Sequence, residues 1–69
     1  MNYNIPVRLA KLGRHQTEII DILRSSGENI TPAEFSRYIR GKENPPKSER
    51  ILTEADKIVE GWEHANANR

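Results

Sequence analysis

Apolar residues recur at steps of three and four along most of the chain, which is the spacing of one buried helix face. This pattern predicts helices at about residues 5–12, 15–26, 32–40 and 46–63. No segment alternates apolar and polar residues in the manner of a half-buried strand. We therefore predict one all-α domain over residues 1–63, followed by a frayed tail at 64–69 that has no large apolar side chain.

Residues with strong backbone preferences mark the ends of these helices. The third helix has the clearest start: Thr31 can cap it, Pro32 fits the first helical position, and Glu34 completes a capping box. Glycines follow the first three helices and are typical helix ends, at Gly13, Gly27 and Gly41. Two adjacent prolines predict that residues 42–46 form an extended linker before the last helix.

The apolar stripes give the candidate core. Its expected members are Ile5, Leu9, Ile19, Ile20, Leu23, Phe35, Ile39, Ile51, Leu52, Ile58 and Val59. Trp62 at the end of the last stripe has two interpretations: it closes the edge of the core, or it anchors a partner or a second copy of the chain.

Size and composition exclude several classes of protein. A chain of 69 residues leaves little room for a catalytic cleft, and the absence of cysteine removes disulfides, thiolate zinc sites and cysteine nucleophiles. No apolar run approaches the roughly 20 residues of a membrane span. His15 and His64 lack metal-ligand spacing, and no catalytic triad or phosphate loop is present. We expect a soluble cytoplasmic protein that is not an enzyme and has no cofactor or metal.

The net charge is only +1, but the charges are unevenly distributed. Residues 1–15 carry three cations and no acid, and residues 35–50 carry five cations and two acids. Between them, residues 16–34 carry four acids and one cation. An acidic segment therefore separates two basic ones.

Two short helices, a connector, a glycine stop and a packing helix describe a helix-turn-helix. In such a domain the helix at 32–40 would enter the major groove of DNA, with cations near its end on phosphates. Arg37, Arg40 and Lys42 have that position, and Gln16 begins the preceding helix. The alternative for these cations is an ordinary solvated helix face.

The chain resembles the phage Cro and repressor family over about residues 5–60. The resemblance rests on Gln16-x-x-Ile19-Ile20-x-x-Leu23 and on Thr31-x-x-x-Phe35-Ser36-x-Tyr38-Ile39-Arg40-Gly41-Lys42-x-x-Pro45. It implies a compact lambda-repressor-like domain of four to five helices that acts in the bacterial host's cytoplasm, with operator DNA as the usual partner. The small size is similar to Cro proteins and to small antirepressors, also called modulators of repression, of phages of Gram-positive bacteria.

Three departures from the family pattern affect the functional prediction. The segment between Leu23 and Ile30 is longer than usual, which implies a longer second helix or a longer turn. The leading residues of the recognition helix include Pro32 and Ala33, which have no side-chain hydrogen bond to offer a base. The third departure is the acidic segment at 16–34, where a groove reader prefers neutral or basic residues.

These departures favour an antirepressor of the lysis/lysogeny switch that binds the DNA-reading domain of its cognate phage repressor. The residues expected to contact that protein are Glu18, Asp21, Ala33, Glu34 and Arg37. The alternative is an autonomous Cro-like repressor, in which Glu34 would also read bases and the DNA contacts would be Gln16, Thr17, Thr31, Ser36, Arg37, Arg40 and Lys42. A third hypothesis is a helical module that forms a homodimer through Ile58, Val59 and Trp62.

Overall fold

The computed structural model describes residues 3–41 and 46–67, and all regular structure in these residues is helical. The helices are α1 (Ile5–Leu12), α2 (Gln16–Ser25), α3 (Pro32–Ile39) and α4 (Pro46–Ala67). The predicted all-α class is therefore confirmed for the described part of the chain. No helix in that part is both long enough and apolar enough to cross a bilayer.

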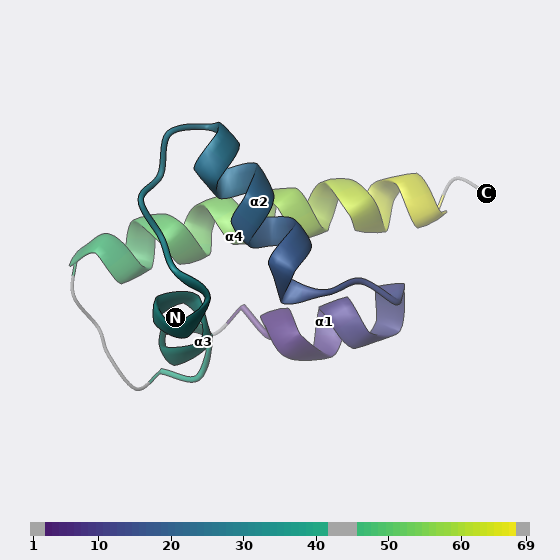
Figure 1. Ribbon diagram of the computed structural model, residues 1–69. Helices are drawn as coiled ribbons and strands as arrows, with labels where there is room; N and C mark the ends of the chain where they lie inside the picture. The colour runs from purple at the N-terminus through teal and green to yellow at the C-terminus, as the bar shows by residue number, and fades with distance from the viewer. Residues whose placement is uncertain (1–2, 42–45, 68–69) are drawn as a thin grey trace.

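Helix α4 is the scaffold on which the three shorter helices pack. It contacts α1, α2 and α3, and α2 also contacts α3. Figure 1 shows α4 along the length of the molecule, with α2 crossing it and α1 and α3 on one side. The Cα radius of gyration is 11.6 Å, close to the roughly 11 Å expected for a compact chain of this length.

One apolar core joins all four helices. Phe35, Ile19, Ile51 and Val59 have no exposed surface, and Ile30 from the turn between α2 and α3 is equally buried. The other buried apolar residues are Ile5, Leu9, Ile20, Leu23, Tyr38 and Ala55. Ile30 thus attaches the turn to the core by the same burial that holds the helices.

The buried face of α3 differs from the prediction at one position. Tyr38 is buried beside Phe35, whereas Ile39 is only partly buried and packs at the core edge. Leu52 and Ile58 on α4 are also partly buried. The reason for the Tyr38 position is that its ring fills the core while its hydroxyl reaches Glu34 at 3.3 Å, so the polar atom has a partner.

The end of α4 also differs from the prediction. The helix continues to Ala67, so residues 64–67 of the predicted tail are helical. Apolar periodicity alone misses this extension, because the added turn contains alanine, the best helix former. His64 also lies 3.8 Å from Glu60 one turn earlier, an arrangement that supports a helix C-terminus when the imidazole is protonated.

Local capping fixes the helix starts that position the candidate site. The Thr31 hydroxyl accepts a hydrogen bond from the Glu34 amide at 3.2 Å, and Glu34 accepts one from the Thr31 amide at 3.2 Å. This is the predicted capping box of α3. At α2, the His15 amide donates to Glu18 at 2.8 Å. The turn at 26–31 and an α2 that ends at Ser25 together account for the length between Leu23 and Ile30.

Replacing Gly61 with alanine should stabilise the protein by about 0.5–1 kcal/mol. Gly61 lies inside α4, and an added Cβ there would meet no atom within 4 Å. The matched control is Gly13→Ala, because Gly13 also has open space but has a φ of +69° that strains an alanine. In urea unfolding, the midpoint concentration should rise for Gly61→Ala and fall for Gly13→Ala. A destabilised Gly61→Ala would contradict the helical assignment of this turn.

Candidate interaction surface around α3

The first turn of α3 presents small and apolar side chains to solvent. Thr31, Pro32 and Ala33 are all exposed. Thr31 is engaged in the capping box, and the other two have no side-chain donor or acceptor. This end of α3 is therefore an exposed surface with little capacity to form hydrogen bonds to a base edge.

Glu34, a predicted partner-contact residue, is engaged within the chain. Besides the Thr31 amide, its carboxylate accepts from the Thr31 hydroxyl at 3.2 Å and from the Tyr38 hydroxyl at 3.3 Å. Lys47 Nζ on α4 lies 3.4 Å from the same carboxylate. The Thr31 amide and the Lys47 ammonium hold the pKa of Glu34 below its ordinary range. Glu34 therefore stabilises α3 and its contact with α4, and it would have to exchange these bonds to bind a partner.

The predicted cations of α3 have different environments. Arg40 follows the last residue of α3 and is exposed, and its guanidinium folds back to donate to Ser36 Oγ at 2.6 Å and to the Ser36 carbonyl at 3.2 Å. Arg37 is half-buried. Lys42 lies outside the described residues. Ser36 and Arg37 at the end of α3 and Arg40 directly after it thus lie in one short stretch of the chain, and Arg40 is hydrogen-bonded to Ser36.

The predicted site residues of α2 lie at its start and along its outer side. Gln16 is half-buried, whereas Thr17 and Asp21 are exposed. Glu18 accepts from the His15 amide and from Arg14 Nη1 at 2.9 Å, and these two bonds, the backbone one first, lower the pKa of its carboxyl. Asp21 is consequently the most accessible carboxylate among the predicted contacts on α2.

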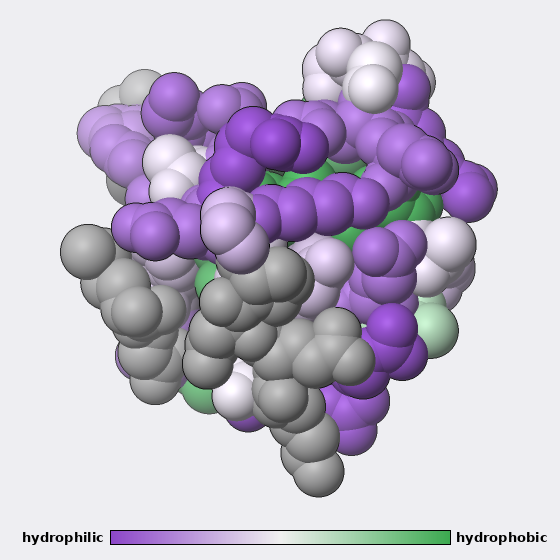
Figure 2. Space-filling model, turned by 90° about the vertical axis from the view of Figure 1, so that its left-hand side faces the viewer, coloured by the Kyte–Doolittle hydropathy of each residue, from purple (hydrophilic) through white to green (hydrophobic). Residues whose placement is uncertain are grey.

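The turn between α2 and α3 is bound to α4 by charged side chains, which we call the turn network: Glu28, Glu34, Lys47 and Arg50. Arg50 donates to both Glu28 oxygens, at 3.1 Å from Nε and 2.9 Å from Nη2. Lys47 reaches Glu34 and also donates to the Asn29 carbonyl. Arg50 lowers the pKa of Glu28, and Glu28 raises that of Arg50. In Figure 2, which views the left side of Figure 1, hydrophilic side chains extend over hydrophobic residues on this face.

Sequence analysis did not identify the turn network, and its members are far apart in the chain. Glu28 and Arg50 are 22 residues apart, and Lys47 follows Glu34 by 13. The only sequence signal was the acidic segment beside a basic one, which does not specify which charges pair. The structure therefore adds Glu28, Lys47 and Arg50 to the surface around α3.

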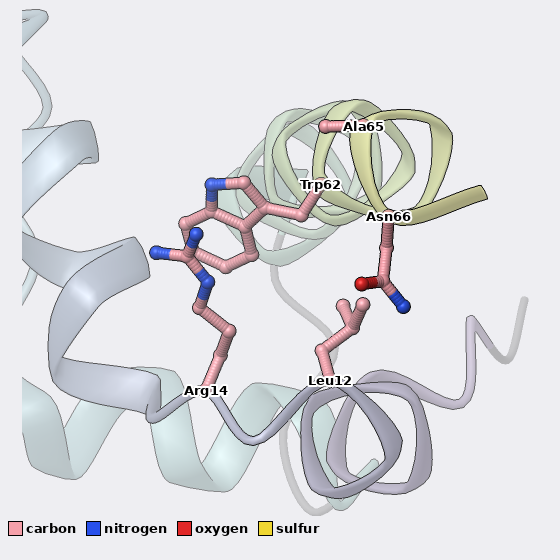
Figure 3. Close-up of a pocket in the computed structure, with 5 residues that line it drawn as sticks. All are labelled: Leu12, Arg14, Trp62, Ala65 and Asn66. Atoms are coloured by element: carbon pink, nitrogen blue, oxygen red, sulfur yellow. The ribbon is translucent and has the colours of Figure 1, made fainter. Parts of the chain in front are cut away.

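Trp62 lies in a second region, at the far end of α4. The guanidinium of Arg14 lies 4.5 Å from the centre of its ring, a cation–π contact. The two side chains line a cavity of about 160 Å³ together with Leu12, Ala65 and Asn66. Figure 3 shows Arg14 and Leu12 directed from the region of α1 toward Trp62 and Asn66 on α4. Trp62 is thus half-buried at the edge of the core, and Val59 has no exposed surface to offer a dimer interface.

A shallow groove between α1 and the start of α2 has a volume of about 410 Å³. Its lining is mixed, with Pro6, Leu9 and Ala10 from α1 and Arg14, His15 and Gln16 from the link into α2. Val7 on α1 is 52% exposed. Gln16 is the only predicted contact residue in this lining, so the groove and the α3 surface are separate features.

The described residues contain no group of three or more His, Cys, Asp or Glu side chains that could hold a metal ion. No protein-family model, curated protein or solved structure matches the chain.

Proposed function

We propose that the protein is a helix-turn-helix regulator of a phage lysis/lysogeny switch that acts as an antirepressor, by binding the DNA-reading domain of its cognate repressor. The helix-turn-helix is α2, the turn at 26–31 and α3, with α3 in the position of the recognition helix. The observation that carries the proposal is the exposed first turn of α3, where Pro32 and Ala33 offer apolar surface and no group that reads a base.

The charges around α3 also favour a protein partner over bare DNA. Lys47 and Arg50, which would add positive potential beside α3, are paired with Glu34 and Glu28. The Arg40 guanidinium is hydrogen-bonded to Ser36. Phosphate binding depends on cations that can release counterions from DNA, and internal pairing reduces that contribution. Exposed apolar atoms surrounded by polar groups suit the interior and rim of a protein interface.

Calorimetric titration with the DNA-reading domain of the proposed cognate repressor tests the proposal. We expect a complex, and we expect Ala33→Arg to weaken it about tenfold or more, the equivalent of about 1.4 kcal/mol, by placing a bulky charge on the contact surface. Ala65→Arg is the matched control, because Ala65 is an exposed helix residue at the other end of the molecule. The proposal fails if the wild-type chain and the repressor domain release no heat on mixing and also elute as separate species in gel filtration.

Autonomous Cro-like operator binding is the second candidate, and the exposure of Thr17 at the start of α2 favours it. It predicts that the protein alone retards operator DNA in a gel and that affinity falls steeply with salt. An antirepressor instead changes the retardation that the repressor produces. One gel with DNA, repressor and both proteins together therefore separates the two functions.

A further inference from the structure

Two cations near the start of α4 are held together on one side of that helix. Lys47 and Arg50 are three residues apart, which places them on neighbouring positions of the helix surface. Both side chains extend to the segment between α2 and the first turn of α3, where their partners are Glu28, Glu34 and the Asn29 carbonyl. The pair of cations is consequently adjacent to the end of α3 that would approach a DNA groove.

The carboxylates of Glu28 and Glu34 bind these two cations in the way that phosphates would. Arg50 binds Glu28 through two parallel hydrogen bonds, and this fork geometry suits carboxylate and phosphate groups alike. Lys47 acts as a point charge against Glu34 at 3.4 Å. We propose that Lys47 and Arg50 form a latent site for the phosphate backbone of duplex DNA, which Glu28 and Glu34 occupy in the isolated chain.

The pairs are accessible enough to be exchanged. The side chains of Arg50 and Lys47 are 58% and 31% exposed, and those of Glu28 and Glu34 are 19% and 27% exposed, so both pairs lie at the surface and are only partly buried. Exposed ion pairs are weak and are screened by salt, whereas duplex DNA offers closely spaced charges and the release of counterions. Exchange of Glu28 and Glu34 for phosphates therefore adds two DNA contacts that the isolated chain suppresses. This site is on α4 and binds DNA, so it goes beyond the protein contact proposed for α3.

Neutralising one carboxylate should expose the site. The variant is Glu28→Gln, which keeps the side-chain shape and removes the charge that pairs with Arg50. The matched control is Glu49→Gln, because Glu49 is exposed on the first turn of α4 and forms no ion pair within residues 3–41 and 46–67. Both variants change the net charge by the same amount, and they differ in whether a cation is released.

Fluorescence anisotropy with a labelled 25-base-pair duplex, measured between 50 and 200 mM NaCl, provides the readout. We expect Glu28→Gln to bind at 50 mM about threefold more tightly than Glu49→Gln. The slope of log affinity against log salt should steepen by about 0.9, the value for one added phosphate contact. Adding Arg50→Gln to Glu28→Gln should remove the gain, whereas Arg50→Gln alone should weaken wild-type binding by a smaller factor, because Glu28 already competes for Arg50 there.

Glu34→Gln provides an independent test through Lys47, because glutamine at this position still completes a capping box. It should also increase DNA affinity, and Lys47→Gln should reverse the increase. Circular dichroism at the assay temperature verifies that each variant is folded. The proposal is overturned if the Glu28 and Glu34 variants bind DNA no better than Glu49→Gln. It is also overturned if Arg50→Gln weakens the wild type as much as it weakens Glu28→Gln.

Discussion

Replacing Phe35 with alanine should lower the free energy of unfolding by about 3–5 kcal/mol, the largest loss expected from one side chain here. Phe35 has no exposed surface and lies on α3, which packs against both α2 and α4. The truncation removes apolar burial and leaves a cavity that rigid helices cannot fill. A small domain has a total stability of roughly 0.05–0.15 kcal/mol per residue, so this loss is a large fraction of the total.

Urea unfolding followed by circular dichroism at 222 nm measures this loss. Phe35→Leu keeps most of the apolar volume and should lose less than about 1.5 kcal/mol. Val7→Ala is the surface control, because Val7 is 52% exposed and should change stability by no more than about 0.5 kcal/mol. If Phe35→Ala and Val7→Ala have similar free energies of unfolding in urea, α3 does not pack on the core as described.

The parts of the fold that sequence reasoning predicted well depend on contacts between near neighbours. The start of α3 is an example, because Thr31 and Glu34 are three residues apart and form the capping box by themselves. The stop after α1 is another, because Gly13 adopts a left-handed conformation with a φ of +69°. Such signals are independent of the rest of the molecule, so one sequence suffices to read them.

The predictions were wrong or incomplete where burial or ion pairing depends on contact with another helix. Which of Tyr38 and Ile39 faces the core depends on the angle at which α3 packs against α4. That angle cannot be derived from the sequence of α3 alone. The ion pairs around the candidate site have the same origin, because Glu28 and Arg50 meet only after α4 folds back over the turn. Sequence analysis therefore located the predicted α3 contacts on one helix but missed the cations of α4 beside them.

Replacing Arg8 with methionine should cost about 2 kcal/mol, because several charge-assisted hydrogen bonds are lost at once. Arg8 on α1 donates to Glu63 at 3.1 and 2.7 Å and to Asp56 at 2.6 Å, both on α4. It also donates to the Tyr3 carbonyl at 3.0 Å, and its side chain is only 20% exposed. Methionine keeps much of the apolar stem, so the variant tests the charged bonds more than the packing.

The matched control for Arg8→Met is Lys57→Met. Lys57 is 68% exposed and lies 3.6 Å from Glu54, three residues away on the same helix. Pairs of this kind contribute only about 0.2–0.5 kcal/mol. Equal losses for the two variants in urea unfolding at pH 7 would show that the Arg8 bonds contribute no more than an exposed pair on one helix.

The stabilisation by Arg8 should also depend on pH in a defined direction. Hydrogen bonding to Arg8 lowers the pKa of Glu63 in the folded protein, and the same bonds to Glu63 and Asp56 raise the pKa of Arg8. A lowered carboxyl pKa stabilises the fold above the unfolded value, about 4.3 for glutamate, and that contribution is lost as the pH falls through the lower folded value. The difference in stability between wild type and Arg8→Met should therefore be largest at neutral pH and shrink below about pH 4. Glu18, Glu28 and Glu34 also have lowered pKa values, but they are present in both proteins, so their contributions cancel in the difference. Unfolding both proteins in urea at pH 7, 5 and 3 checks this, and a difference that stays constant with pH would assign the effect to packing of the Arg8 stem instead of its bonds to Glu63.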